Sequence, residues 1–271
     1  MDRKGLKMLT LSLFFVAFTL AGTGGYAQDA SPGESKWEFE LIPYLWMSNV
    51  SGDVTVEGSS SHAKLNFGDI FSDLQFGGQV HMEARKDRWG LFLDATYLNL
   101  STEESTTDPN VGPIYADFGM KEWLVEFGGL YQLGRWPLGK AEWPALALDV
   151  LGGGRYWSLS GDLDLYAPQA GISLDKSDTK DWIDPFVGLR LRLNLTKNLL
   201  LMLRGDVGGF SVGSQFSWNA SAVLGYSISR VVSVGLGYRA LYVDYESGSG
   251  SDKFEYKVTM YGPVVGVGFY F

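Results

Sequence analysis

Charged side chains recur at every second position in several stretches of this sequence. Arg190 and Arg192 are two residues apart, and so are Arg204 and Asp206. Because side chains at i and i+2 of a β-strand point to the same side, each pattern gathers its charges on one face. A lone buried ion costs several kcal/mol, whereas the planar guanidinium of arginine suits bidentate pairing with carboxylates. The spacing therefore predicts an enclosed network of ion pairs.

Residues for other chemistry are scarce. The chain has no cysteine and two histidines, His62 and His81. His81 and Glu83 share a strand face, as a general base and its orienting acid would, but the spacing indicates no serine nucleophile for them. The acidic residues between 162 and 181 do not have the spacing of an EF-hand calcium loop. We therefore predict no catalytic residue, no metal site and no cofactor, and we do not expect an enzyme.

The elements that carry these charges are amphipathic strands. In residues 183–195 the odd positions are apolar, while Asp184, Arg190 and Arg192 occupy even positions. This period-two alternation is typical of a strand with one apolar and one polar face. A water-soluble sandwich also alternates, but the apolar faces here run for six or more positions, as a tilted membrane-crossing strand requires. The expected strands are residues 36–47, 74–86, 89–101, 114–134, 144–165, 181–195, 198–210, 215–228, 231–246 and 254–271.

The connections between these strands alternate in length. The links after the second, sixth and eighth strands have two or three residues, and most of those after the odd strands are longer and polar. The exceptions are residues 135–143, a longer turn at the end with the short links, and the brief link near Gly213 at the other end. Short turns at one end and long loops at the other are typical of transmembrane β-barrels with an even strand number. In the first long link, residues 48–73, Gly52–Glu57 predicts an extension above the membrane. Asp69–Leu74 predicts one helical turn at the rim, with Asp69 as its N-cap.

The predicted fold class is thus all-β: a transmembrane, antiparallel, up-and-down β-barrel of about 10 strands, between 8 and 12, after a cleaved signal peptide. Arg3, Lys4 and Lys7 precede the apolar run 8–21, and Gly25-Tyr26-Ala27 suits signal peptidase. We place the cleavage before Gln28, so residues 1–27 form the signal peptide and 28–271 a single barrel domain. The last strand ends in an alternation that resembles the C-terminal assembly signal of such barrels. Its residues are Val267, Phe269 and Phe271.

The polar faces of the strands should line the lumen. Barrels of eight strands are filled by side chains, whereas sixteen strands leave an aqueous channel, so ten strands fall near the filled end. The expected lumen charge network comprises Glu83, Arg85, Asp94, Glu122, Glu126, Asp149, Arg155, Asp184, Arg190, Arg192, Arg204, Asp206 and Arg239.

Five short motifs carry a family resemblance. They are residues 43–46 (Pro-Tyr-Leu-Trp), 153–157 (Gly-Gly-Arg-Tyr-Trp), 184–190, 204–210 and 237–241. Together they resemble a widespread group of uncharacterised Gram-negative outer-membrane β-barrel proteins. The resemblance spans nearly the whole chain after the signal peptide. It implies the barrel fold and a place in the outer membrane, but no activity and no catalytic residue.

These observations lead to three candidate functions. We expect a structural or interaction protein of the outer membrane with a polar, largely filled lumen. The alternatives are a narrow, porin-like channel for small solutes and, third, an outer-membrane hydrolase. Export should follow the Sec route, and the expected partners are outer-membrane lipid, lipopolysaccharide and the barrel-assembly machinery. The net charge of −9 argues against nucleic acid, and we expect a monomer.

Overall fold

The structure is a computed structural model that describes residues 36–108, 112–139 and 143–271. The signal peptide expected at residues 1–27 lies outside the described residues. Among them, no helix has the length and apolar character needed to cross a membrane.

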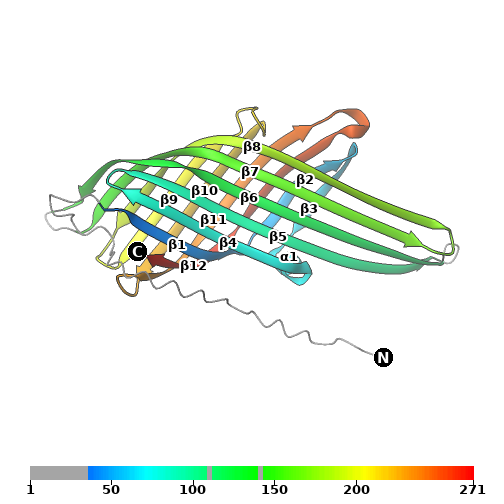
Figure 1. Ribbon diagram of the computed structural model, residues 1–271, viewed down its shortest axis with the longest axis horizontal. Coiled ribbons are helices and arrows are strands. Elements are labelled where there is room, and N and C mark those ends of the chain that lie inside the picture. The colour runs from blue at the N-terminus through cyan, green and yellow to red at the C-terminus, as the bar shows by residue number, and fades with distance from the viewer. Residues whose placement is uncertain (1–35, 109–111, 140–142) are drawn as a thin grey trace, which may run out of the picture.

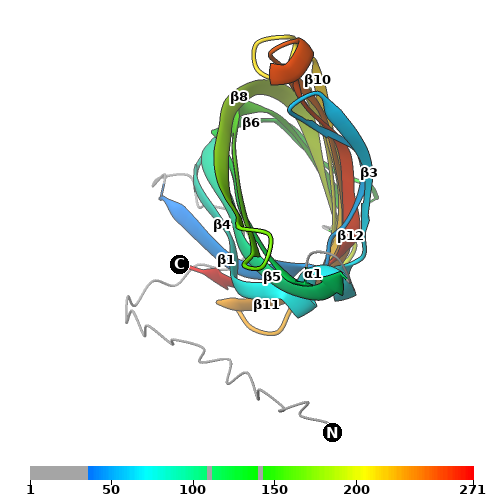
Figure 2. The same cartoon turned by 90° about the vertical axis from the view of Figure 1, so that its right-hand side faces the viewer.

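Twelve strands form one antiparallel sheet that closes on itself (Figures 1 and 2). The ring runs through β1, then β4 to β12, and the pairing of β12 with β1 closes it. Ten strands therefore make the barrel, as the sequence predicts, and hairpin β2–β3 is added beside β12. The strands are β1 (Glu38–Trp46), β2 (Asn49–Val56), β3 (Ser59–Leu65), β4 (Leu74–Lys86), β5 (Trp89–Asp108), β6 (Gly112–Pro137), β7 (Ala145–Ala167), β8 (Ile172–Asn194), β9 (Leu199–Gly208), β10 (Phe216–Ser227), β11 (Val232–Ser247) and β12 (Phe254–Tyr270).

The two ends of the barrel differ in the length of their connections. At one end, residues 87–88, 195–198 and 228–231 form short turns, and β1 begins beside the end of β12. In a barrel of this type the short turns face the periplasm and the longer connections face outward. The longest outer connection, between β1 and β4, contains the predicted extension as hairpin β2–β3, whose first strand pairs with the outer part of β12.

The helix in this connection begins earlier than predicted. Helix α1 spans Phe67–Asp73, and Asn66 is its N-cap, so the prediction of Asp69 as the cap was wrong. The side chain of Asn66 accepts a hydrogen bond from the Asp69 backbone N–H at 3.1 Å. Asp69 Oδ2 in turn accepts one from the Asn66 backbone N–H at 3.0 Å. This reciprocal capping box satisfies two backbone donors that a cap at Asp69 would leave without partners.

The outside of the barrel is apolar. Leu189 and Leu236 expose 52% and 63% of their surface, far more than a water-soluble core would allow. Exposed aromatic residues mark both edges of this surface; along β10, Phe216 and Tyr226 are ten residues apart. At ~3.3 Å per residue and a tilt of ~40° this spacing is about 25 Å, the height of the lipid-facing band of such barrels. The outer aromatic belt contains Phe76, Tyr97, Trp123, Tyr156, Phe216, Trp218 and Tyr242, and the periplasmic belt Trp37, Phe39, Trp89, Tyr131, Trp136, Tyr226, Phe269 and Phe271.

Strands β5 to β8 continue well beyond the outer aromatic belt (Figure 1). The sequence predicted that β5 ends near residue 101 and that β8 begins near 181, whereas the ladders continue to Asp108 and Ile172. Above the membrane no lipid requires an apolar outer face, so the alternation fades although the backbone hydrogen bonds continue. We call residues 99–108, 112–121, 160–167 and 172–179 the extracellular sheet.

The assignment of faces can be tested on β8. Leu189→Arg places a charge on the lipid-facing surface, which costs about 2–4 kcal/mol near the midplane. We expect a clear loss of folded, membrane-inserted protein. Ser177→Arg is the matched control, because Ser177 points outward on the same strand but above the outer aromatic belt. Equal insertion yields for the two variants would show that Leu189 does not face lipid.

Candidate functional site

The centre of the lumen is organised around Glu126, whose side chain is fully buried. Its Oε1 accepts hydrogen bonds from Arg155 Nε at 2.7 Å and from Arg239 Nη2 at 3.0 Å. Nη2 of Arg204 lies 2.9 Å from its Oε2, an ion pair without hydrogen-bond geometry. These three arginines come from β7, β11 and β9, so one carboxylate on β6 ties together distant parts of the wall.

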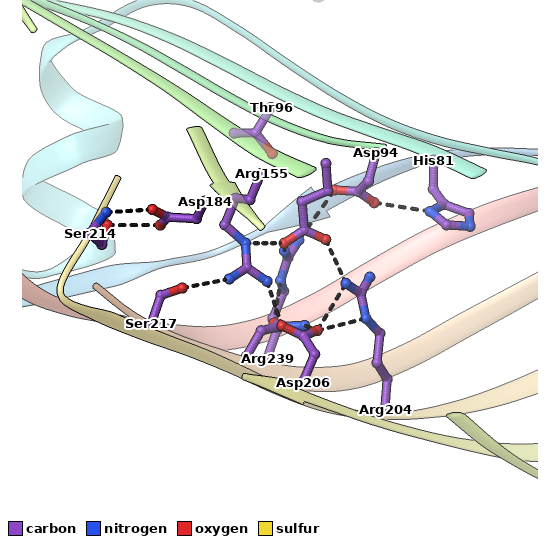
Figure 3. Close-up of polar contacts among 12 residues, drawn as sticks. His81, Asp94, Thr96, Arg155, Asp184, Arg204, Asp206, Ser214, Ser217 and Arg239 are labelled. Atoms are coloured by element: carbon purple, nitrogen blue, oxygen red, sulfur yellow. Dashed lines mark hydrogen bonds and ion pairs between the residues drawn. The ribbon is translucent and has the colours of Figure 1, made fainter. Parts of the chain in front are cut away.

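Asp206 completes this central cluster from β9. It accepts hydrogen bonds from Arg155 Nη2 at 2.6 Å and from Arg204 Nε at 3.0 Å, and the amide of Asn219 donates to it at 2.9 Å. Figure 3 shows Arg155, Arg204 and Arg239 converging with Asp206 in the interior. Because charge-assisted bonds satisfy each member from several sides, the cluster offsets part of the cost of enclosing its charges.

A second cluster lies nearer the periplasmic end. Glu83 on β4 accepts from Arg190 on β8 through both terminal nitrogens, at 2.6 and 3.1 Å, and also pairs with Arg85. Asp149 on β7, fully buried, accepts from Arg85 at 2.8 Å, from Arg190 at 3.1 Å and from Arg192 at 3.3 Å. Ion pairs therefore cross the interior of the ring, and their partners come from opposite walls as well as from adjacent strands.

His81 connects the two clusters. Its Nδ1 lies 3.1 Å from Asp94, which Arg239 joins to the central cluster, and its Nε2 lies 3.7 Å from Glu83. Both ring nitrogens therefore face carboxylates, an arrangement that holds the imidazole in place. Among the described residues no serine or threonine hydroxyl makes a hydrogen bond with His81, so the geometry does not assemble a nucleophile–base pair there.

Two of the predicted network residues face the lumen but take no part in its ion pairs. Glu122 is buried and forms no ion pair or hydrogen bond with any described residue; Leu98 and Leu159 are its neighbours across β5 and β7. Asp184 accepts from the backbone N–H and the hydroxyl of Ser214, at 2.6 and 2.7 Å. It fastens the link between β9 and β10, while its neighbour across the ladder, Arg155, bonds elsewhere (Figure 3).

The outer half of the lumen is lined mainly by apolar and aromatic side chains, a layer that was not predicted from the sequence. Trp182 stacks on Tyr245 with a centroid distance of 4.0 Å, and Trp157 stacks on Trp182 at 5.5 Å. Trp157 is two residues from Arg155 on β7, and Trp182 is two residues from Asp184 on β8, so each tryptophan shares a strand face with a lumen charge. This spacing could have placed both side chains inside the barrel. The buried residues of this aromatic tier are Trp46, Leu124, Trp157, Leu159, Trp182, Leu241, Val243, Tyr256, Val258 and Met260.

The proposed assembly signal lies on the outer wall. Val267 and Phe271 are exposed at the periplasmic end, and the backbone of Phe271 pairs with that of Phe39 through hydrogen bonds of 2.9 and 3.1 Å. Phe269 pairs with Leu41 across the closing seam. Their role in assembly stays a prediction.

Together, a closed ring of ten strands, an apolar exterior and an enclosed charge network define a transmembrane β-barrel. No family model and no curated protein matches the chain. Among solved structures, it is similar to the outer membrane protease OmpT of Escherichia coli, at 8% identity, with 88% of this chain and 97% of that chain covered and a TM-score of 0.48. It is also similar to Ail of Yersinia pestis, an attachment invasion locus protein, at 14% identity, with 88% of this chain and 100% of that chain covered and a TM-score of 0.35. A third similar structure is the outer membrane protein OprG of Pseudomonas aeruginosa, at 14% identity, with 88% of this chain and 98% of that chain covered and a TM-score of 0.32.

The network around Glu126 gives a direct prediction for stability. Glu126→Gln removes the charge that faces three arginines and should lower the free energy of unfolding by about 3–5 kcal/mol, the cost of unbalancing a buried pair. Glu122→Gln is the matched control, because Glu122 lies four residues away on the same face of β6 and its loss leaves no described cation unpaired. We expect it to be neutral or stabilising in denaturant unfolding of the refolded protein. Similar losses for both variants would contradict the network.

Proposed function

We propose that this protein is an outer-membrane β-barrel whose lumen is filled by side chains and which serves as a rigid support for its extracellular sheet. The observation that carries the proposal is the burial of charged side chains at the centre of the lumen. Glu126, Asp149, Arg155 and Asp184 have no exposed surface. A solute path would have to separate these groups from their partners, and an unpaired buried charge costs several kcal/mol.

The aromatic tier supports the same proposal. It lies on the extracellular side of the central cluster, and Trp157, Leu241 and Val243 within it are fully buried. A barrel that conducts polar solutes would need water along its whole axis, whereas this tier presents rings and aliphatic side chains. The two layers together make the interior a second core that fixes the wall from inside.

A narrow channel remains the second candidate function, because one side of the lumen carries small residues. On the inner faces of β10, β11 and β12, Gly225, Gly235, Gly266 and Gly268 occur at inward positions toward the periplasmic end. A Cβ atom built on Gly225 would approach no atom closer than 3.9 Å. The hydrolase candidate is weaker, because carboxylates occupy both nitrogens of His81.

The apolar outer surface between the two aromatic belts supports an outer-membrane location for the protein. Cell fractionation tests this location. We expect the full chain, expressed in a Gram-negative host, to sediment with outer membranes. Unheated and boiled samples should migrate differently on a denaturing gel, because a closed ladder has no edge from which to unfold. Recovery in the soluble periplasmic fraction, with a single gel position before and after heating, would refute the membrane barrel.

Planar-bilayer recording of the refolded protein distinguishes the filled barrel from the channel. We expect no stable single-channel steps from the wild type at moderate voltage. Arg190→Ala, which removes a side chain that links Glu83 to Asp149, should show steps or increased leak if the filling side chains are the barrier. Reproducible ion-selective steps from the wild type would overturn the filled lumen and establish the channel.

A further inference from the structure

The extracellular sheet has two edges with which no further described strand pairs, and an exposed face that only the β2–β3 turn contacts, at the β8 edge. Beyond the barrel, β5 pairs only with β6, and β8 pairs only with β7, over residues 101–108 and 172–181. The ladder places Phe118, Leu163 and Lys176 in one row on the side that continues the lumen face, with Leu165 and Leu174 in the next row. We call this side, over residues 102–106, 114–118, 163–167 and 172–176, the inner face.

The inner face is apolar where the sheet projects into water. Phe118 on β6 exposes 50% of its surface, and Ile172 and Leu174 on β8 expose 46% and 40%. Leu163, on the strand between them, exposes 36%. Contiguous exposed apolar side chains on a region outside the membrane mark a contact surface, because their hydration is unfavourable. At the β8 edge Glu57, in the β2–β3 turn, accepts hydrogen bonds from Lys176 at 2.7 and 2.8 Å. The hairpin thus bounds the inner face on that side.

The opposite face of the same sheet carries a row of acids. Register places Glu103, Asp117, Asp164 and Asp175 directly beside one another on β5, β6, β7 and β8. The carboxylate of Asp175 raises the pKa of Asp164, and no described cation pairs with that residue. Within the described part of the extracellular sheet, Lys121 and Lys176 are the only basic residues, so the sheet is strongly negative around its apolar face.

The negative charge of the extracellular sheet favours some binding partners for the inner face over others. A second copy of the chain would bring the same acidic sheet, and lipopolysaccharide and nucleic acids bring phosphates, so all three are repelled. A polypeptide with apolar side chains on one face and lysine or arginine around them satisfies both features. Its apolar residues would cover Phe118, Leu163 and Leu174, while its cations would approach Glu104 on the same face and the acidic row around the sheet edges.

We propose that the inner face of the extracellular sheet is a binding site for a cationic, amphipathic polypeptide. The inference rests on the proposed function, since only a supporting barrel holds this sheet in place outside the membrane. It adds the class of partner and the residues that contact it.

The test uses the refolded full chain in zwitterionic lipid nanodiscs, with empty nanodiscs as the blank. A fluorescent peptide of alternating leucine and lysine is titrated at low salt, and anisotropy is recorded. A leucine–glutamate peptide of the same length is the charge control. We expect saturable binding of the lysine peptide alone, weakened at least about tenfold by 0.5 M salt, because screening shortens the range of the acidic field.

Two variants separate the contributions of the face and the charge. Phe118→Ser should weaken binding by about tenfold, because it removes a large apolar contact from the centre of the site. Tyr115→Ser is its matched control, since Tyr115 is equally exposed on the opposite face of β6. Asp164→Asn with Asp175→Asn should weaken binding and reduce its salt dependence. Every variant is first checked for the heat-dependent gel shift of the folded barrel.

Three results would overturn the inference: no saturable binding by the wild type, equal binding of the leucine–glutamate peptide, or equal losses for Phe118→Ser and Tyr115→Ser. The same nanodisc preparation is used for planar-bilayer recording after fusion. Wild-type protein that neither conducts nor binds refutes this inference while leaving the proposed function intact. Wild-type protein that conducts refutes the proposed function itself, whatever the peptide does.

Discussion

The whole structure depends on closing the backbone ladder within the membrane. In hydrocarbon an unpaired N–H or C=O group costs several kcal/mol, so a sheet can span lipid only as a ring without edges. Here the seam between β1 and β12 makes the ring, with Glu40 opposite Tyr270 at one end and Trp46 opposite Val264 at the other. Closure fixes the alternation of every strand, and the alternation assigns one face to lipid and the other to an enclosed interior.

Closure of the ring creates an enclosed interior that side chains fill. Ten strands enclose more space than apolar side chains alone fill here, and the sequence supplies arginines and carboxylates in matched positions. Glu126 pairs with three arginines from three strands, and Asp149 pairs with three arginines from two strands, β4 and β8, so the ion pairs connect distant parts of the wall. The aromatic tier on their extracellular side adds an apolar layer around Trp157 and Trp182. Under the proposed function, these two layers support the extracellular sheet.

Much of this could be predicted from the sequence, because a lipid-facing strand leaves a strict period of two. The alternation at Leu189, Arg190 and Leu191 was sufficient to place the ring strands and to assign their charges to the interior. What the period does not encode is length beyond the membrane. Residues 102–108 are polar on both faces of the strand, and in residues 172–180 the apolar side chains lie on the face that continues the lumen. Neither segment has an apolar outer face, so the predicted strands ended at the edge of the membrane. The cap at Asn66 was missed for a different reason, since Asp69 satisfied the same residue preference three positions later.

Partner choice within the interior also escaped the sequence. Parity tells that Asp184 and Arg155 share a face, and the ladder indeed makes them neighbours. Ser214, in the short link after β9, nevertheless takes Asp184, because its backbone N–H and hydroxyl satisfy both carboxylate oxygens. Residues in a loop lack the alternation of apolar and polar positions, so the sequence does not predict which of them contact the lumen side chains. The unpaired Glu122 is equally invisible, because its neighbours Leu98 and Leu159 become known only from the register.

Thiol labelling in intact cells tests the arrangement most directly, since the chain has no cysteine of its own. A membrane-impermeant maleimide is applied to cells that express Thr106→Cys in the extracellular sheet, Ser217→Cys in the lumen or Asn198→Cys in a short turn. The hydroxyl of Ser217 accepts a hydrogen bond from Arg155 of the central cluster at 3.2 Å. The structure predicts rapid labelling at position 106 and none at 198 until the cells are broken. At the fully buried position 217 it predicts none until the protein is unfolded. Labelling of position 217 in intact cells as fast as position 106 would show an open, water-filled lumen and contradict the account.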